Sequence, residues 1–196
     1  MEAQQHKYNR VLVQREGLKV RLVVTMLLAG TAACSAAQTV PESFSLLLKG
    51  DGRTWCAYKD PAEFQSQVTA LKPTESARIT YSSSTLTELT YQIEADSGDW
   101  IVIDQYTPSN GEIRLRRANL MAQQNLQIIQ ETIVHGGKVD PFRVVSVTTL
   151  DGKKAELSDV DFPAVPVSTN LLTLPLVQVV AEMRSRSLGQ LCKSLK

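Results

Sequence analysis

The stretch that decides the fold spans residues 76–157: SARITYSSSTLTELTYQIEADSGDWIVIDQYTPSNGEIRLRRANLMAQQNLQIIQETIVHGGKVDPFRVVSVTTLDGKKAEL. Six segments rich in β-branched and aromatic residues alternate in it with short polar turns. The expected strands are 77–81, 88–95, 99–106, 112–118, 125–135 and 142–149. The turns contain Ser97-Gly98, Asn110-Gly111, Gly136-Gly137 and Asp151-Gly152. Because such turns leave no room for a crossover helix, the sequence predicts an antiparallel β-meander.

Period-two patterning supports the strand assignment. In residues 89–94, LTYQIE, apolar side chains alternate with polar ones, as in a sheet that is wet on one face. Arg114 and Arg116 alternate with Ile113 and Leu115 in the same way. Residues 100–103, WIVI, are apolar on both faces, which indicates a central strand covered on each side. Residues 153–157 are expected to return as a brief strand after the turn at Asp151-Gly152.

Helices are expected on both sides of the meander. In residues 61–71, Asp60 caps the helix, Pro61 takes its first position and Glu63 completes a capping box. Residues 44–48 fit either a helical turn or a first strand. A closing helix is expected from about Thr173 or Leu174, with an apolar stripe at Leu176, Val180, Met183, Ser187 and Leu191 that carries Cys192 towards Cys56; Gly189 either ends the main helix or kinks it. The predicted class is α+β, with an antiparallel meander of about five to seven strands packed against an N-terminal and a C-terminal amphipathic helix.

The N-terminus resembles a secretory leader. Lys19 and Arg21 precede the apolar run of residues 22–29, and small residues follow as far as Ala37. We therefore expect residues 1–37 to be a signal peptide and residues 38–196 to form one domain, either periplasmic or secreted. Cys34 offers an alternative, because bacterial lipoproteins are cut before a cysteine that then carries lipid. In that case the chain would be anchored to a membrane.

Charge restricts the partners of the mature chain. The whole chain has 21 basic and 20 acidic residues, and the leader contains five of the basic and two of the acidic ones. The mature chain therefore has 16 basic and 18 acidic residues, a formal charge of −2. A domain that binds nucleic acid is usually clearly basic, because neutralising phosphates supplies most of its affinity. Nucleic acid is thus excluded as an expected partner, and so is electrostatic binding to anionic lipid.

Cysteine content fits an exported chain. Once Cys34 is removed or lipidated, only Cys56 and Cys192 remain. An even number of cysteines in an oxidising compartment favours a disulfide between these two. The alternative is a pair of buried free thiols.

No catalytic, cofactor or metal site emerges from the remaining residues. His135 is the only histidine after the leader, and it adjoins Gly136-Gly137 with no recognisable nucleophile motif. Asp104 shares a strand side with aromatic residues, so either a raised pKa with acid–base activity or a structural contact with an arginine fits it. Arg114, Arg116 and Arg117 form a basic cluster that suits either an anionic ligand or a polar sheet surface.

The leader, the segment Trp55-Cys56-Ala57 and residues 97–104, SGDWIVID, together resemble small exported proteins of environmental bacteria. That resemblance implies a periplasmic or secreted location and no particular chemistry. The function we expect is non-enzymatic: binding of an envelope protein or an envelope-associated role. One alternative is a carrier of an apolar ligand, with a half-barrel like that of lipoprotein carriers. A second is an enzyme of unknown class, for which Asp104 and His135 would be the residues to test.

Overall fold

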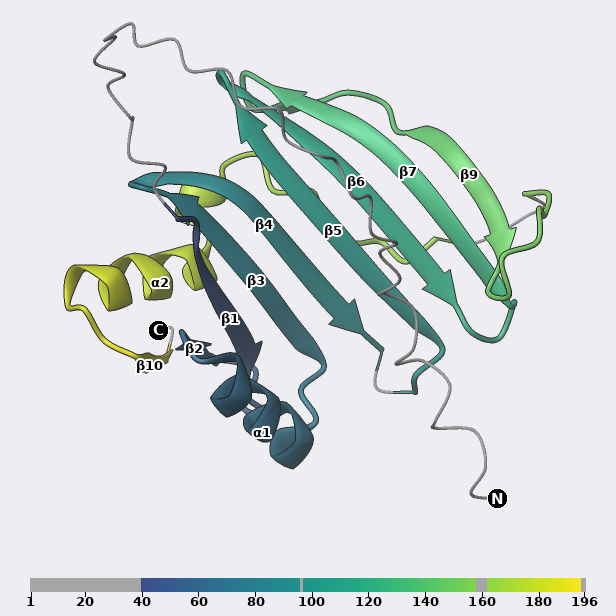
Figure 1. Ribbon diagram of the computed structural model, residues 1–196. Coiled ribbons are helices and arrows are strands. Elements are labelled where there is room, and N and C mark those ends of the chain that lie inside the picture. The colour runs from purple at the N-terminus through teal and green to yellow at the C-terminus, as the bar shows by residue number, and fades with distance from the viewer. Residues whose placement is uncertain (1–39, 96, 158–161, 195–196) are drawn as a thin grey trace, which may run out of the picture. The chain divides into compact units, whose positions relative to one another are not determined.

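A computed structural model describes residues 40–95, 97–157 and 162–194. In these residues the chain forms an antiparallel sheet of ten strands with two α-helices (Figure 1). This confirms the α+β class and the antiparallel meander. The expected leader, residues 1–37, and Cys34 within it lie outside the described residues, as does Asp96 in the turn before Ser97.

Along the chain, two strands and a helix come first, a long meander follows, and two helical segments and a last strand complete the described residues. The strands are β1 (Glu42–Leu48), β2 (Thr54–Tyr58), β3 (Glu75–Ser82), β4 (Thr85–Glu94), β5 (Trp100–Ser109), β6 (Glu112–Met121), β7 (Leu126–His135), β8 (Lys138–Val139), β9 (Arg143–Thr149) and β10 (Gln190–Ser194). The helices are α1 (Pro61–Leu71), the 3-10 helix η1 (Leu171–Thr173) and α2 (Pro175–Ser185).

The meander contains all six strands expected from the sequence. Each of β3, β4, β5, β6 and β7 pairs antiparallel with the next, and β9 pairs with β7. Two of its turns have both central residues in the left-handed region, with φ of 51° and 83° at Asn110-Gly111 and 55° and 78° at Gly136-Gly137. Such turns match the right-handed twist of the flanking strands, which explains why these residues start hairpins here.

The sheet has ten strands, more than the five to seven expected of the meander, because β1, β2 and β10 extend it at one end. Residues 44–48 belong to a strand, β1, which pairs with both β2 and β3. The return strand expected at 153–157 is reduced to a single bridge between Thr148 and Lys154. Residues around the turn bond to one another instead, with Thr149 donating its hydroxyl to Asp151 and the Lys153 ammonium lying 2.8 Å from the Asp151 carboxylate.

The closing helix is shorter than expected. Helix α2 begins at Pro175 and buries Leu176, Val180 and Met183, as the stripe predicts. It ends at Ser185, however, and residues 190–194 form β10 along β2. The expected continuation of the apolar stripe to Leu191 and Cys192 as helix was therefore wrong, and the helix ends even before Gly189, the residue at which the sequence offered an end or a kink. Strand β2 would otherwise present unpaired backbone N–H and C=O groups at a sheet edge, and β10 satisfies them.

Strand pairing brings the two cysteines together. Cys192 in β10 lies directly opposite Cys56 in β2, and their sulfur atoms are 2.09 Å apart. The pair is thus compatible with the disulfide expected from the sequence. Cys56 is fully buried, whereas Cys192 lies on an exposed edge strand.

The two helices pack on opposite faces of the β1–β2 end of the sheet (Figure 1). Neighbouring residues of β1 divide between two clusters: Leu46 joins the larger one beneath α2, and Leu47 joins the smaller one beneath α1. Helix α1 has its expected bounds, and its Asp60 cap accepts a hydrogen bond from the N–H of Ala62. Its contact with the sheet is light, because Phe64 and Val68 are only half-buried.

We expect loss of the cysteine pair to destabilise the chain strongly. The bridge would close a loop with a sequence separation of 136 residues, which in the chain-entropy model contributes about 4–5 kcal/mol. Urea unfolding of the mature chain should show a free energy lower by about that amount in the Cys56→Ala/Cys192→Ala variant. A reducing agent should destabilise the native chain and leave the double variant unchanged. Equal sensitivity of the two proteins to reductant would contradict the bridge.

Candidate functional site

Asp104 and Arg117 form a buried ion pair in the middle of the sheet. They lie directly opposite each other on β5 and β6. Arg117 donates from Nε to Oδ1 at 2.6 Å and from Nη2 to Oδ2 at 2.7 Å, and the Asp104 side chain is 1% exposed. The hydroxyl of Tyr106 donates to the same carboxylate, and the ring of Phe142 lies under the guanidinium group. This arrangement fits the structural interpretation of Asp104 better than the acid–base one.

Two tyrosines near this pair have strongly perturbed acidities. Burial, with the Asp104 charge second, raises the pKa of Tyr106 to about 12. Burial also raises the pKa of Tyr91, as does its hydrogen bond to the carboxylate of Glu75. Both groups therefore stay neutral through the physiological range.

The other candidates from the sequence are dispersed. His135 is exposed at the end of β7, with Nδ1 3.6 Å from a Glu112 carboxylate oxygen. Arg114 and Arg116 point to the solvent face of β6, opposite to the face of Arg117, so the expected cluster of three arginines is divided. Arg116 instead lies beside Glu131, at 3.6 Å. Within the described ranges, no group of three or more His, Cys, Asp or Glu side chains could hold a metal ion.

Several aromatic residues of the strands pack into the two core clusters. Trp55 packs against Tyr91 in the larger cluster, and Tyr58 packs against Phe64 beneath α1. In residues 100–103, Val102 is 1% exposed, whereas the other three are half-buried. Core packing accounts for these side chains without a ligand.

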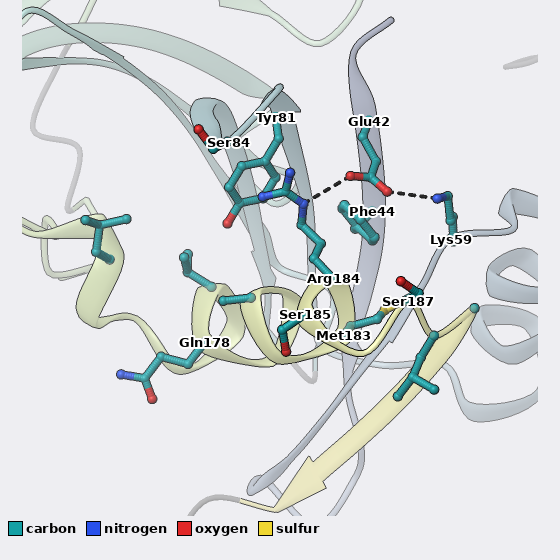
Figure 2. Close-up of a pocket in the computed structure, with 15 residues that line it drawn as sticks. Glu42, Phe44, Lys59, Tyr81, Ser84, Gln178, Met183, Arg184, Ser185 and Ser187 are labelled. Atoms are coloured by element: carbon teal, nitrogen blue, oxygen red, sulfur yellow. Dashed lines mark hydrogen bonds and ion pairs between the residues drawn. The ribbon is translucent and has the colours of Figure 1, made fainter. Parts of the chain in front are cut away.

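A large hollow lies along α2, and we call it the α2 groove (Figure 2). Its volume is about 880 Å³, and it is bounded by the start of β1, the β3–β4 turn, helix α2 and the segment 187–189 that leads into β10. Apolar walls come from Phe44, Val177 and Met183. Charged groups gather at one end, from Glu42, Lys59 and Arg184.

Arg184 is held firmly in this groove. Its Nε donates to Glu42 Oε2 at 3.0 Å, its Nη2 donates to the carbonyl of Ser83, and its guanidinium lies 4.1 Å from the centroid of the Tyr81 ring. Lys59 donates to the other Glu42 oxygen at 2.8 Å. The hydrogen bond from Lys59, aided by Arg184, lowers the pKa of the Glu42 carboxyl.

A second hollow, which we call the rim hollow, adjoins the first. It has a volume of about 510 Å³ and lies between the β3–β4 turn, the β5–β6 turn and η1. Ser84 and Leu172 line both hollows. Leu172 is 68% exposed, which is unusual for a leucine and places an apolar side chain on the ridge between them.

Sequence patterns could not reveal the α2 groove. Glu42 and Arg184 are separated by 142 positions, and nothing local to either residue predicts their contact. The exposed Leu172 also belongs to a three-residue helix with no periodicity to read. By contrast, Asp104 and Arg117 belong to neighbouring strands of one hairpin, so their pairing follows from strand register.

Comparison with known proteins found no matching family model, no matching curated protein and no matching solved structure. Among the helices of the described ranges, none is long and apolar enough to cross a membrane.

We expect the Asp104–Arg117 pair to be needed for stability. Asp104→Leu leaves an uncompensated buried guanidinium group, which should cost about 3–5 kcal/mol in urea unfolding. The double variant Asp104→Leu/Arg117→Leu removes both charges and should recover most of that loss. A double variant as unstable as the single one would show that the charges do not act as a pair.

Tyr106 should make the fold sensitive to alkali. Its folded pKa, about 12, exceeds the ordinary value near 10, so its contribution to stability is complete below pH 10 and is lost as the pH rises towards 12. The free energy of unfolding of Tyr106→Phe should therefore fall less steeply over that interval than that of the native chain. Parallel profiles from urea unfolding would contradict the raised pKa.

Proposed function

We propose that the mature chain is an exported, non-enzymatic binding protein that recognises an envelope protein at the α2 groove. Export is supported by the leader-like sequence of residues 1–37 and by the cysteine pair, which suits an oxidising compartment. Cleavage before Gln38 gives a periplasmic or secreted chain, and lipidation at Cys34 would give an anchored one. The resemblance to small exported bacterial proteins agrees with either outcome.

The observation that carries the binding proposal is the contrast between a filled core and an open groove. Leu46, Ile79 and Val180 are all 0% exposed between the sheet and α2. A carrier that encloses an apolar ligand needs an empty cavity in that position. The α2 groove lies at the surface and combines apolar walls with fixed charges, which is the composition of a protein-recognition site.

A carrier of an apolar ligand is the second candidate function, with the ligand bound at the surface. Leu172 and Leu188 are exposed along the α2 groove, so an apolar molecule would lie against them rather than inside the sheet. Burial of the Asp104 ion pair and exposure of His135 give no support to the enzyme alternative.

We expect a single charge introduced at Leu172 to weaken partner binding strongly. The mature chain purified from its own envelope should appear in native mass spectra with a bound protein, whose affinity is then measured with purified components. Leu172→Asp should weaken that complex at least tenfold, because it puts a carboxylate on the apolar ridge. Leu150→Asp is the matched control, since Leu150 is also exposed and lies in the turn after β9.

The outcomes separate the candidates. Bound lipid in place of protein would support the carrier, and equal binding by both variants would exclude the α2 groove as the site. Circular dichroism of both variants shows whether each remains folded.

A further inference from the structure

The carboxylate of Glu42 lies between two cationic side chains and forms an ion pair with each of them. Its two oxygens are shared between Lys59, at 2.8 Å, and Arg184, at 3.0 Å (Figure 2). The three charges sum to +1, and all three residues line the α2 groove. The chain's own carboxylate thus shows how an acidic group is bound at this end of the groove.

The two cations have donors to spare. A guanidinium group has five N–H donors and an ammonium group has three. Among the described residues, Arg184 uses donors on Nε and Nη2, and Lys59 uses one donor on Glu42. Arg184 is also kept in place by the Tyr81 ring and the Ser83 carbonyl, so it would not need to reorganise when another carboxylate replaces Glu42.

The other residues that line the α2 groove are suited to an apolar side chain next to the bound acidic group. Val177, Ala181 and Leu188 line it beside Arg184, and Leu172 leads into the rim hollow. Two connected open hollows favour an extended chain over a small molecule, which would be more fully enclosed.

We propose that the α2 groove binds an extended segment of a partner protein that carries an Asp or Glu side chain, held by Arg184 and Lys59, beside an apolar side chain that contacts Leu172. In the unbound protein Glu42 holds the cations, and the partner's carboxylate competes with it. This inference rests on the proposed binding function and adds the chemistry of the partner.

The test uses two blocked hexapeptides, one with a single glutamate among leucines and one with glutamine in its place. The native mature chain should prefer the glutamate peptide in fluorescence polarisation. Glu42→Gln removes the competing carboxylate and should strengthen glutamate-peptide binding at least fivefold, with little change for the glutamine peptide. Arg184→Gln should abolish the preference.

Matched controls lie at the C-terminal end of α2 and just after it. Arg186 and Glu182 form an ion pair at 2.9 Å and do not line the α2 groove. Arg186→Gln and Glu182→Gln should therefore leave both affinities within twofold of the native values. If Arg184→Gln does not fold, Lys59→Gln tests the same site, because the Lys59 side chain is 58% exposed and tolerates replacement.

The results of these experiments distinguish a failure of the carboxylate site from a failure of the proposed binding function. A Glu42→Gln variant with unchanged glutamate-peptide affinity, or an Arg184→Gln variant that keeps the preference, would overturn the carboxylate site. The proposed function would still stand if Leu172→Asp continued to release the natural partner. Decanoate binding that is enhanced by Glu42→Gln, without peptide binding, would overturn the peptide in favour of a lipid-like acid.

Discussion

The structure depends on covering both faces and both edges of β2. All five residues of this strand are buried, although it lies next to the edge of the sheet. Because alternate side chains of β2 lie on opposite faces of the sheet, a helix is needed on each face. Trp55 and Ala57 join the cluster beneath α2, and Cys56 and Tyr58 join the one beneath α1. The remaining edge requires a pairing strand, and the chain supplies β10. Both helices and the cysteine pair can thus be understood as consequences of burying one five-residue strand.

Sequence reasoning succeeded where structure is specified locally. The six meander strands follow from turn residues such as Asn110-Gly111, whose left-handed φ angles suit a hairpin, and from alternation that is intrinsic to a strand. The bounds of α1 follow from Asp60 and Pro61 at its start and from Lys72, in the left-handed region, just before Pro73. In these cases the deciding interactions join residues that are close in sequence.

Sequence reasoning failed where the deciding contact is made with residues far away in the sequence. Residues 190–194 have an apolar residue at Leu191 that continues the stripe of α2, so the local pattern favours helix. The backbone of β2, more than 130 residues earlier in the chain, decides otherwise. Asp104 shows an intermediate case: a contact with an arginine was one of two expectations, but only the strand register selects Arg117 over Arg116. The Glu42–Arg184 contact lies beyond any local pattern.

The same distant pairing shapes the proposed binding site. The segment that joins α2 to β10 contributes Leu188 and Gly189 to the α2 groove, and the Lys59 N–H donates to the Gly189 carbonyl at 2.9 Å. Lys59 follows directly on β2, so the strand pair that carries the two cysteines also positions one of the two cations. Glu42 comes from the first residue of β1, the other neighbour of β2. The pairing of β1 with β2 thus brings Glu42 and Lys59 together, while Arg184 comes from α2, just before the segment that leads into β10. A change that frees β10 would alter the groove through Leu188 and Gly189 even though it touches none of its charges.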